Sequence, residues 1–272
     1  MKRTAFFVSD GTGITAETLG HSMLSQFGDV QFEQVTLPYV NSREATEQAV
    51  ARINEVARQD SAKPIVFSTL VNEEHREILA GCEALLLDMF AVFVGPLEQE
   101  LGMRSSHKVG QSHSIRDHEA YRIRIDAVHF ALDNDDGART RHYDLADVIL
   151  VGVSRSGKTP TSLYLALQFG LYAANYPLTE DDFDDLRLPD ALLPHKDKLF
   201  GLTIDPERLA AIRSERKAGS RYASARQCDM ETRALEALFN RYNIPNLNAT
   251  ELSIEEISTR ILAKTGLQRR LQ

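Results

Sequence analysis

Residues 147–169 read DVILVGVSRSGKTPTSLYLALQF, and this stretch decides the fold of the second half of the chain. The unbroken Val-Ile-Leu-Val run at 148–151 is typical of a buried parallel strand, because such a strand meets apolar neighbours on both faces. A glycine-rich loop follows at once, and a helical pattern then continues to about residue 169. Strand, loop and helix in this order predict a parallel α/β unit whose loop lies at the carboxyl end of a strand.

The loop itself reads GVSRSGKT and satisfies the phosphate-binding pattern G-x-x-x-x-G-K-[ST]. Its two glycines let the backbone wrap closely around phosphate oxygens, and the following helix directs its positive dipole end at the anion. Lys158 supplies a point charge to the terminal phosphates, and Thr159 offers a hydroxyl to Mg²⁺. The structural alternative is a glycine-rich turn that fits the pattern by chance. We predict that the nucleotide phosphates bind residues 152–159, namely Gly152, Val153, Ser154, Arg155, Ser156, Gly157, Lys158 and Thr159.

The rest of the chain alternates short apolar runs with helical segments, which predicts two α/β units. The first unit is expected over residues 1–140, ending near the turn-rich DNDDG at 133–137, and is a candidate for partner docking. The second, over 141–272, is expected to be a kinase-like parallel sheet flanked by helices around the phosphate loop. Strands are predicted at 4–8, 32–37, 64–68, 147–151, 171–175, 199–204 and 244–247. Helices are predicted at 14–27, 43–58, 73–80, 117–132, 206–216, 223–242 and 254–264.

The composition excludes several classes of protein. Hydrophobic residues make up 43% of the chain, enough for buried cores. The formal charge of −8 disfavours a nucleic-acid partner, because polyanions repel one another. No segment has the roughly 20 apolar residues of a membrane helix, and the amino terminus lacks the features of a signal peptide. Two cysteines far apart in sequence, Cys82 and Cys228, indicate neither a disulfide framework nor a thiol metal site, so a cytoplasmic location is expected.

A nucleotide bound at this loop can serve phosphoryl transfer. Besides the loop, that reaction needs a carboxylate to accept a proton and cationic groups to neutralise the phosphates, and the sequence offers candidates for both. Asp205 follows the strand at 199–204, where a carboxylate could hold Mg²⁺ through water or accept the hydroxyl proton, and it is our first candidate for the base. Capping of the next helix is the structural alternative. Asp10 is the second candidate, in the loop SDGTG at 9–13. This loop either contacts a phosphate or is an ordinary strand-to-helix turn capped by Asp10 or Thr12. Arg216 and Arg221 belong to a cationic stretch that either closes over phosphates or lies on a solvated face.

A polar segment at 95–114 has no clean periodicity and is predicted to be a long loop. It contains His107 and His113, but the spacing of its histidines matches no zinc motif. Simple solvent exposure accounts for this segment. The functional hypothesis is that it contacts a protein partner, since functional contacts concentrate on loops.

Several motifs together resemble a known family, the bacterial phosphoenolpyruvate synthase regulatory proteins, which are related to the pyruvate, phosphate dikinase regulatory proteins. The resemblance spans essentially the whole chain, and its phosphate loop matches without departure. The motifs are SDGTGITAET at 9–18, VGQSHS at 109–114, ALDNDDG at 131–137, GVSRSGKTPTSLYLA at 152–166, ANYPLTEDD at 174–182 and KLFGLTIDPERL at 198–209.

The resemblance implies a bifunctional enzyme that uses ADP to phosphorylate a threonine of phosphoenolpyruvate synthase. It also implies the reverse activity, in which inorganic phosphate attacks the phosphothreonine and pyrophosphate is released. The expected ligands are therefore ADP, Mg²⁺ and inorganic phosphate, and the expected partner is the synthase, with self-association left open. Two other functions remain open from the residues: a small-molecule kinase using the same loop, and a nucleotide-binding adaptor without catalysis.

Overall fold

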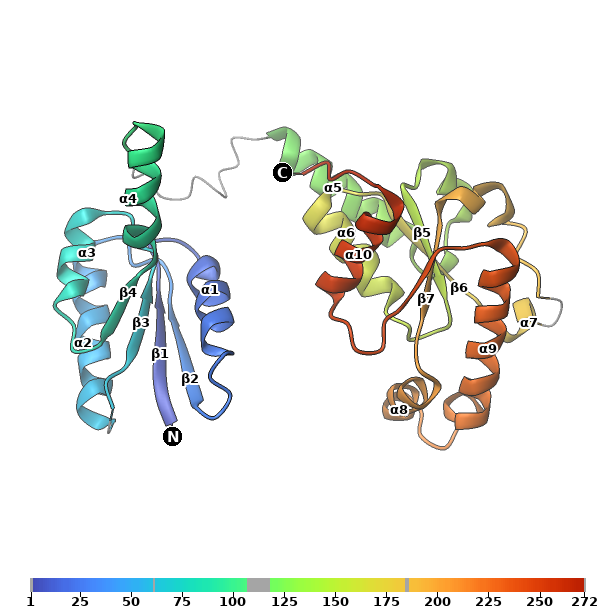
Figure 1. Cartoon of the computed structure of the whole chain (residues 1–272), viewed down its shortest axis with the longest axis horizontal. Coiled ribbons are helices and arrows are strands. Elements are labelled where there is room, and N and C mark those ends of the chain that lie inside the picture. The colour runs from blue at the N-terminus through green and yellow to red at the C-terminus, as the bar shows by residue number, and fades with distance from the viewer. Residues whose placement is uncertain (1, 61, 107–117, 184–185, 272) are drawn as a thin grey trace. The chain divides into compact units, whose positions relative to one another are not determined.

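A computed structural model describes residues 2–60, 62–106, 118–183 and 186–271 of the chain. It contains two units, Met1–Ser114 and Ile115–Gln272, and each is built on a four-stranded parallel sheet (Figure 1). The expected division after residue 140 therefore falls within the second unit. The reason is that helix α5 (His118–Asp133) packs against α6 (Lys158–Phe169), so the segment before the DNDDG turn belongs with the phosphate loop.

In the first unit, every strand of the sheet is followed by a helix, as Figure 1 shows. The strand order is β2-β1-β3-β4, and all pairs are parallel. The strands are β1 (Lys2–Val8), β2 (Gln31–Leu37), β3 (Ile65–Ser68) and β4 (Leu85–Asp88), and the helices are α1 (Ile14–Leu24), α2 (Arg43–Gln59), α3 (Glu73–Ala80) and α4 (Met89–Leu101).

The second unit repeats this strand order, as β6-β5-β7-β8, again with parallel pairing throughout. Its strands are β5 (Val148–Gly152), β6 (Ala173–Pro177), β7 (Leu199–Thr203) and β8 (Asn246–Asn248). Its further helices are α7 (Glu180–Phe183), α8 (Pro206–Arg216), α9 (Ala225–Tyr242) and α10 (Ile254–Thr265), and its short 3₁₀ turns are η2 (Asp135–Gly137), η3 (Thr140–Leu145), η4 (Leu193–Lys198) and η5 (Arg221–Ala223).

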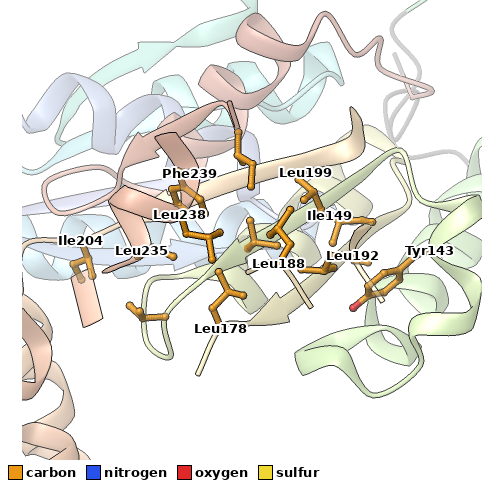
Figure 2. Packing of buried hydrophobic residues seen from close by; sticks show 14 of the residues in the cluster. Tyr143, Ile149, Leu178, Leu188, Leu192, Leu199, Ile204, Leu235, Leu238 and Phe239 are labelled. Atoms are coloured by element: carbon orange, nitrogen blue, oxygen red, sulfur yellow. The ribbon is translucent and has the colours of Figure 1, made fainter. Parts of the chain in front are cut away.

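The central strand β5 is buried on both faces, as its apolar run predicts. Ile149 and Val151 point into the cluster that Figure 2 shows, where α9 contributes Leu235, Leu238 and Phe239. The alternate residues Val148 and Leu150 point to the opposite face, where they pack with residues of α6 and α10. This two-sided burial fixes the position of β5, and with it the starting point of the phosphate loop.

The segment at 95–114 differs from its prediction. Helix α4 continues to Leu101 although it contains Gly95 and Pro96, so the loop prediction is wrong for this part. Phe93, Leu97 and Leu101 recur at helical spacing, but their side chains are exposed, so packing of these three residues does not explain why the helix continues past Gly95 and Pro96. Residues 107–114, with both predicted histidines, lie outside the described residues. Within the described ranges, no helix combines the length and the apolar composition needed to cross a bilayer.

Candidate active site

The phosphate loop connects β5 to α6, and each of its two glycines has a distinct structural reason. A Cβ atom on Gly152 would lie 2.5 Å from the carbonyl oxygen of Leu202 in the neighbouring strand β7, so only glycine fits there. Gly157 precedes α6 with a left-handed φ of 89°, which glycine adopts at little cost. No side chain of the described residues caps the start of α6. Its first amide groups are therefore available to an anion.

Lys158 is the first residue of α6, and its side chain lies almost completely buried, with 4% exposed. Its Nζ donates a hydrogen bond of 2.9 Å to the carbonyl oxygen of Val153, across the loop. Burial lowers the pKa of the ammonium from 10.5 to about 8, while the carboxylates of Asp136 and Asp135 oppose this shift. No carboxylate of the described residues forms an ion pair with Lys158, so a bound phosphate would supply the missing counter-charge.

A cavity of about 290 Å³ opens in front of the loop, which is near the lower end of the usual range for small-molecule sites, about 300–1,000 Å³. It is lined by Asp136, Ser154, Arg155, Gly157, Lys158, Thr159, Pro160, Ile212 and Arg216. Three cationic side chains and one carboxylate face this space, which favours an anionic ligand. The predicted role of Arg216 agrees with this position. Arg221 instead pairs with Glu180 on the surface and does not line the cavity.

Arg213 of α8 contacts the phosphate loop, and no sequence motif marks this residue. Its side chain is 1% exposed, and Nη2 donates to the carbonyl oxygen of Ser154 at 3.2 Å and to Glu231 Oε2 at 2.7 Å. Its guanidinium also stacks on the ring of Tyr222, with Cζ 4.1 Å from the ring centroid. The Tyr222 hydroxyl in turn lies 2.9 Å from Ser154 Oγ. This network holds the first half of the loop in place.

The structure brings a carboxylate to the loop that the sequence analysis assigned only to a turn. Thr159 Oγ1 donates a hydrogen bond of 2.8 Å to Asp135 Oδ1. The same oxygen accepts a bond from Asn175 Nδ2 at 2.5 Å. The next residue, Asp136, lines the cavity with a left-handed φ of 46°, which is uncommon for a residue other than glycine. The sequence signal for these residues is the DNDDG run at 133–137, which indicates a turn and not a carboxylate at the loop.

Of the two predicted carboxylates, Asp205 belongs to the same unit as Lys158 but does not line the cavity beside it. Asp205 caps α8, where its Oδ1 accepts the amides of Glu207 at 2.9 Å and Arg208 at 3.2 Å, so the capping alternative is confirmed. It lines a separate cavity of about 590 Å³ at the ends of β7 and β8. Asp10 lies in the first unit. Its role and that of Asp205 as a base stay predictions.

Asp10 is 7% exposed and accepts the amide of Val71 at 2.8 Å, which joins the loop after β1 to the loop after β3. The loop at 9–13 thus contains a strand-to-helix turn held by its own side chains, since Ser9 Oγ also accepts the amide of Gly11 at 3.2 Å. The turn of the structural alternative is therefore present, but its cap is not: α1 begins after Gly13 without a side-chain cap from the described residues, and Asp10 bonds Val71 instead.

Comparison with known proteins gives a consistent result over nearly the whole chain. The model of the kinase/pyrophosphorylase family matches residues 5–262. A protein of Alcanivorax borkumensis is 77% identical over the full length of both chains. A protein of Stutzerimonas stutzeri is 60% identical, again over both full lengths, and one of Marinobacter nauticus is 58% identical over 99% of each chain. All three are provisionally named as phosphoenolpyruvate synthase regulatory proteins.

Proposed function

The chain belongs to the kinase/pyrophosphorylase family, and from this membership we propose that it regulates phosphoenolpyruvate synthase by reversible phosphorylation. In one direction it uses ADP to phosphorylate a threonine of the synthase. In the other, it uses inorganic phosphate to remove that phosphoryl group as pyrophosphate. The names of the full-length relatives support the choice of target. A cytoplasmic setting is part of this proposal.

The observation that carries the proposal is the cationic cavity at the phosphate loop, with a buried lysine that lacks a carboxylate partner among the described residues. Both directions need such a site, because ADP, inorganic phosphate and pyrophosphate are all compact anions. In the forward direction the threonine oxygen bonds to the β-phosphorus of ADP, and the bond from this phosphorus to the bridging oxygen breaks, releasing AMP. The hydroxyl proton passes to a base.

In the reverse direction an oxygen of inorganic phosphate bonds to the phosphorus of phosphothreonine. The bond from phosphorus to the threonine oxygen then breaks, that oxygen takes up a proton, and pyrophosphate leaves. Each direction transfers one phosphoryl group between oxygen atoms, so a single site for two adjacent phosphates serves both.

Different residues at the loop bind the phosphates and the cation. Lys158 and the first amides of α6 hold phosphate oxygens, and Arg216 faces the same space from the end of α8. Thr159 presents a hydroxyl oxygen, a donor type that Mg²⁺ accepts, so the residues present fit the expected cation. Mg²⁺, when bound, supplies positive charge that neutralises the phosphates during transfer. The Arg213 network keeps the loop in the shape that these contacts need.

The test incubates the pure protein with phosphoenolpyruvate synthase, Mg²⁺ and ADP labelled at its β-phosphate, and then asks whether the label reaches a threonine. The reverse assay supplies unlabelled phosphate to the labelled synthase and measures labelled pyrophosphate. Lys158→Ala should abolish both activities. Lys264→Ala is the matched control, because this lysine bonds the carbonyl oxygen of Asn246 away from the cavity. Turnover of a metabolite without labelling of the synthase would indicate a small-molecule kinase and would refute the proposal.

A further inference from the structure

The hydrogen bond between Thr159 and Asp135 is a feature that the proposed function leaves without a role. Phosphate loops of this type hold the cation of the nucleotide with the hydroxyl of the loop residue after the lysine, together with an acidic group from elsewhere in the fold. The Thr159 hydroxyl lies 2.8 Å from Asp135 Oδ1. Asp135 is partly buried, so its carboxylate lies at the loop rather than in open solvent.

Asn175 fixes Asp135 in this position. Its side-chain nitrogen donates to Asp135 Oδ1 at 2.5 Å, and its side-chain oxygen accepts the amide of Asp136 at 3.0 Å. Asn175 is completely buried on β6, directly beside Leu150 of β5 in the sheet. The backbone amide of Asn175 also donates to the carbonyl oxygen of Asn134 at 3.2 Å. The acidic turn of residues 134–137 is therefore attached to the strand that neighbours the phosphate loop.

We propose that Asp135, together with Thr159, holds the divalent cation that accompanies the bound nucleoside diphosphate. This inference rests on the proposed nucleotide site and extends it by naming the acidic group. The described residues contain no cluster of three or more histidine, cysteine or acidic side chains that would hold a metal alone. A cation bound through one carboxylate and one hydroxyl takes its other oxygen ligands from phosphate and water, which is the usual arrangement for Mg²⁺.

The alternative candidate, Asp205, lies on the other side of β5. It follows β7, whereas Asp135 is held by β6, and these two strands flank β5. Both amide bonds of Asp205 serve the cap of α8, and its side chain lines the cavity at the ends of β7 and β8. The acidic group at the Thr159 hydroxyl thus comes from the side of β5 that β6 occupies, and not from the side of β7.

The experiment measures how strongly a cation and ADP promote each other's binding. Isothermal titration gives the dissociation constant of ADP first with EDTA and then with excess Mn²⁺, and the ratio of the two constants is the coupling. The electron paramagnetic resonance signal of Mn²⁺ in the presence of ADP reports independently on the bound metal. Asp135→Asn keeps an oxygen for the Thr159 and Asn175 hydrogen bonds but removes the charge. It is expected to reduce the coupling by about tenfold to 100-fold.

Binding of ADP in EDTA should stay unchanged or become slightly tighter in Asp135→Asn, because a negative charge beside the phosphates is lost. This result, with an unchanged thermal midpoint, excludes misfolding as the cause. Asp133→Asn is the matched control: it removes a charge from the same segment, but Asp133 is exposed and pairs with Arg139. The control should keep the coupling of the wild type.

Two results would overturn the inference. The first is full coupling in Asp135→Asn, with or without a loss in Asp136→Asn, and the second is loss of coupling in Asp205→Asn. Thr159→Val provides a second route, because in a double-mutant cycle its effect on coupling should not add to that of Asp135→Asn. Additive effects would also contradict a shared cation. If wild-type protein binds no ADP with or without metal, the proposed function itself fails, and this outcome is distinct from the others.

Discussion

Replacement of Lys158 by methionine is expected to stabilise the second unit while it removes nucleotide binding. The Lys158 side chain is 4% exposed, and burial lowers the pKa of its ammonium to about 8 from 10.5. At pH 7 the group is charged in both the folded and the unfolded protein, so the folded state contains a desolvated charge. Methionine has a similar length and no charge, and it fills the same space without this cost.

The size of the effect follows from the pKa shift. A pKa lowered from 10.5 to about 8 corresponds to roughly 3 kcal/mol, at about 1.4 kcal/mol for each pKa unit. The lost hydrogen bond to the carbonyl oxygen of Val153 offsets about 1 kcal/mol of the gain. We therefore expect Lys158→Met to raise the free energy of unfolding by about 2 kcal/mol at pH 7.

The pH dependence provides an internal check. Between about pH 8 and 10.5 the folded protein has lost the Lys158 proton, but the unfolded chain still binds it. The unfolded state then binds more protons, so the stability of the wild type rises with pH relative to that of the variant. The advantage of Lys158→Met should be complete below about pH 8 and should be lost as the pH approaches 10.5.

The two cysteines allow this stability to be measured in one unit alone. Cys228 is fully buried in the second unit, and Cys82 lies in the first. In a Cys82→Ser background, labelling of the Cys228 thiol at increasing urea concentration therefore reports unfolding of the second unit. Lys264→Met serves as the surface control. If Lys158→Met lowers the stability of this unit, or if its effect does not change with pH, the assignment of a desolvated charge is wrong.

Three further predictions concern the same loop. Phosphate binding should raise the pKa of Lys158 back toward its ordinary value, so ADP affinity should fall as pH rises above about 8. Binding above this pH should take up a proton, which calorimetric titrations in buffers of different ionisation enthalpy measure. No proton uptake at pH 9 would contradict this prediction. Arg213→Met should cost about 3 kcal/mol in urea unfolding, because the half-buried Glu231 carboxylate loses its cationic partner and keeps the hydrogen bond from Gln227. A cost below about 1 kcal/mol would contradict this role. Gly152→Ala should weaken ADP binding by about 1–3 kcal/mol, because the added Cβ would meet the carbonyl oxygen of Leu202 and displace the loop. Fluorescence titration measures the affinity. Unchanged affinity would refute the close approach of Gly152 to Leu202.

The strand, turn and helix around residues 152–159 were predictable because their information is local. The strand, the glycine-rich turn and the helix are consecutive, and the spacing of Gly157, Lys158 and Thr159 specifies the geometry. The cap of α8 by Asp205 was also predictable as an alternative, since an aspartate directly before a proline and a helical segment is a common start signal. Local signals of this kind do not depend on the order of the strands.

The carboxylate at the loop was not predictable, because its position depends on contacts across the fold. Asp135 precedes β5 in sequence, and it reaches Thr159 only because Asn175 of β6 holds the acidic turn. From sequence alone the DNDDG run indicates a turn, and the turn suggested a domain boundary. The structure shows that Gly137 instead lies close against Tyr176, where an added Cβ would meet the ring at 3.0 Å. Tertiary contacts, rather than composition, decided the role of this segment.

The two units also show why strand order alone does not assign a phosphate site. Both sheets have the same order, and each places a glycine-containing loop after its first strand, where ligands of α/β proteins commonly bind. In the second unit this loop leads into a buried lysine with no carboxylate partner among the described residues. In the first unit the corresponding loop contains the buried Asp10 carboxylate, which is already bound to the amide of Val71. The two loops therefore differ in the charged side chain that each one buries, a lysine in the second unit and a carboxyl group in the first, although their topology is the same.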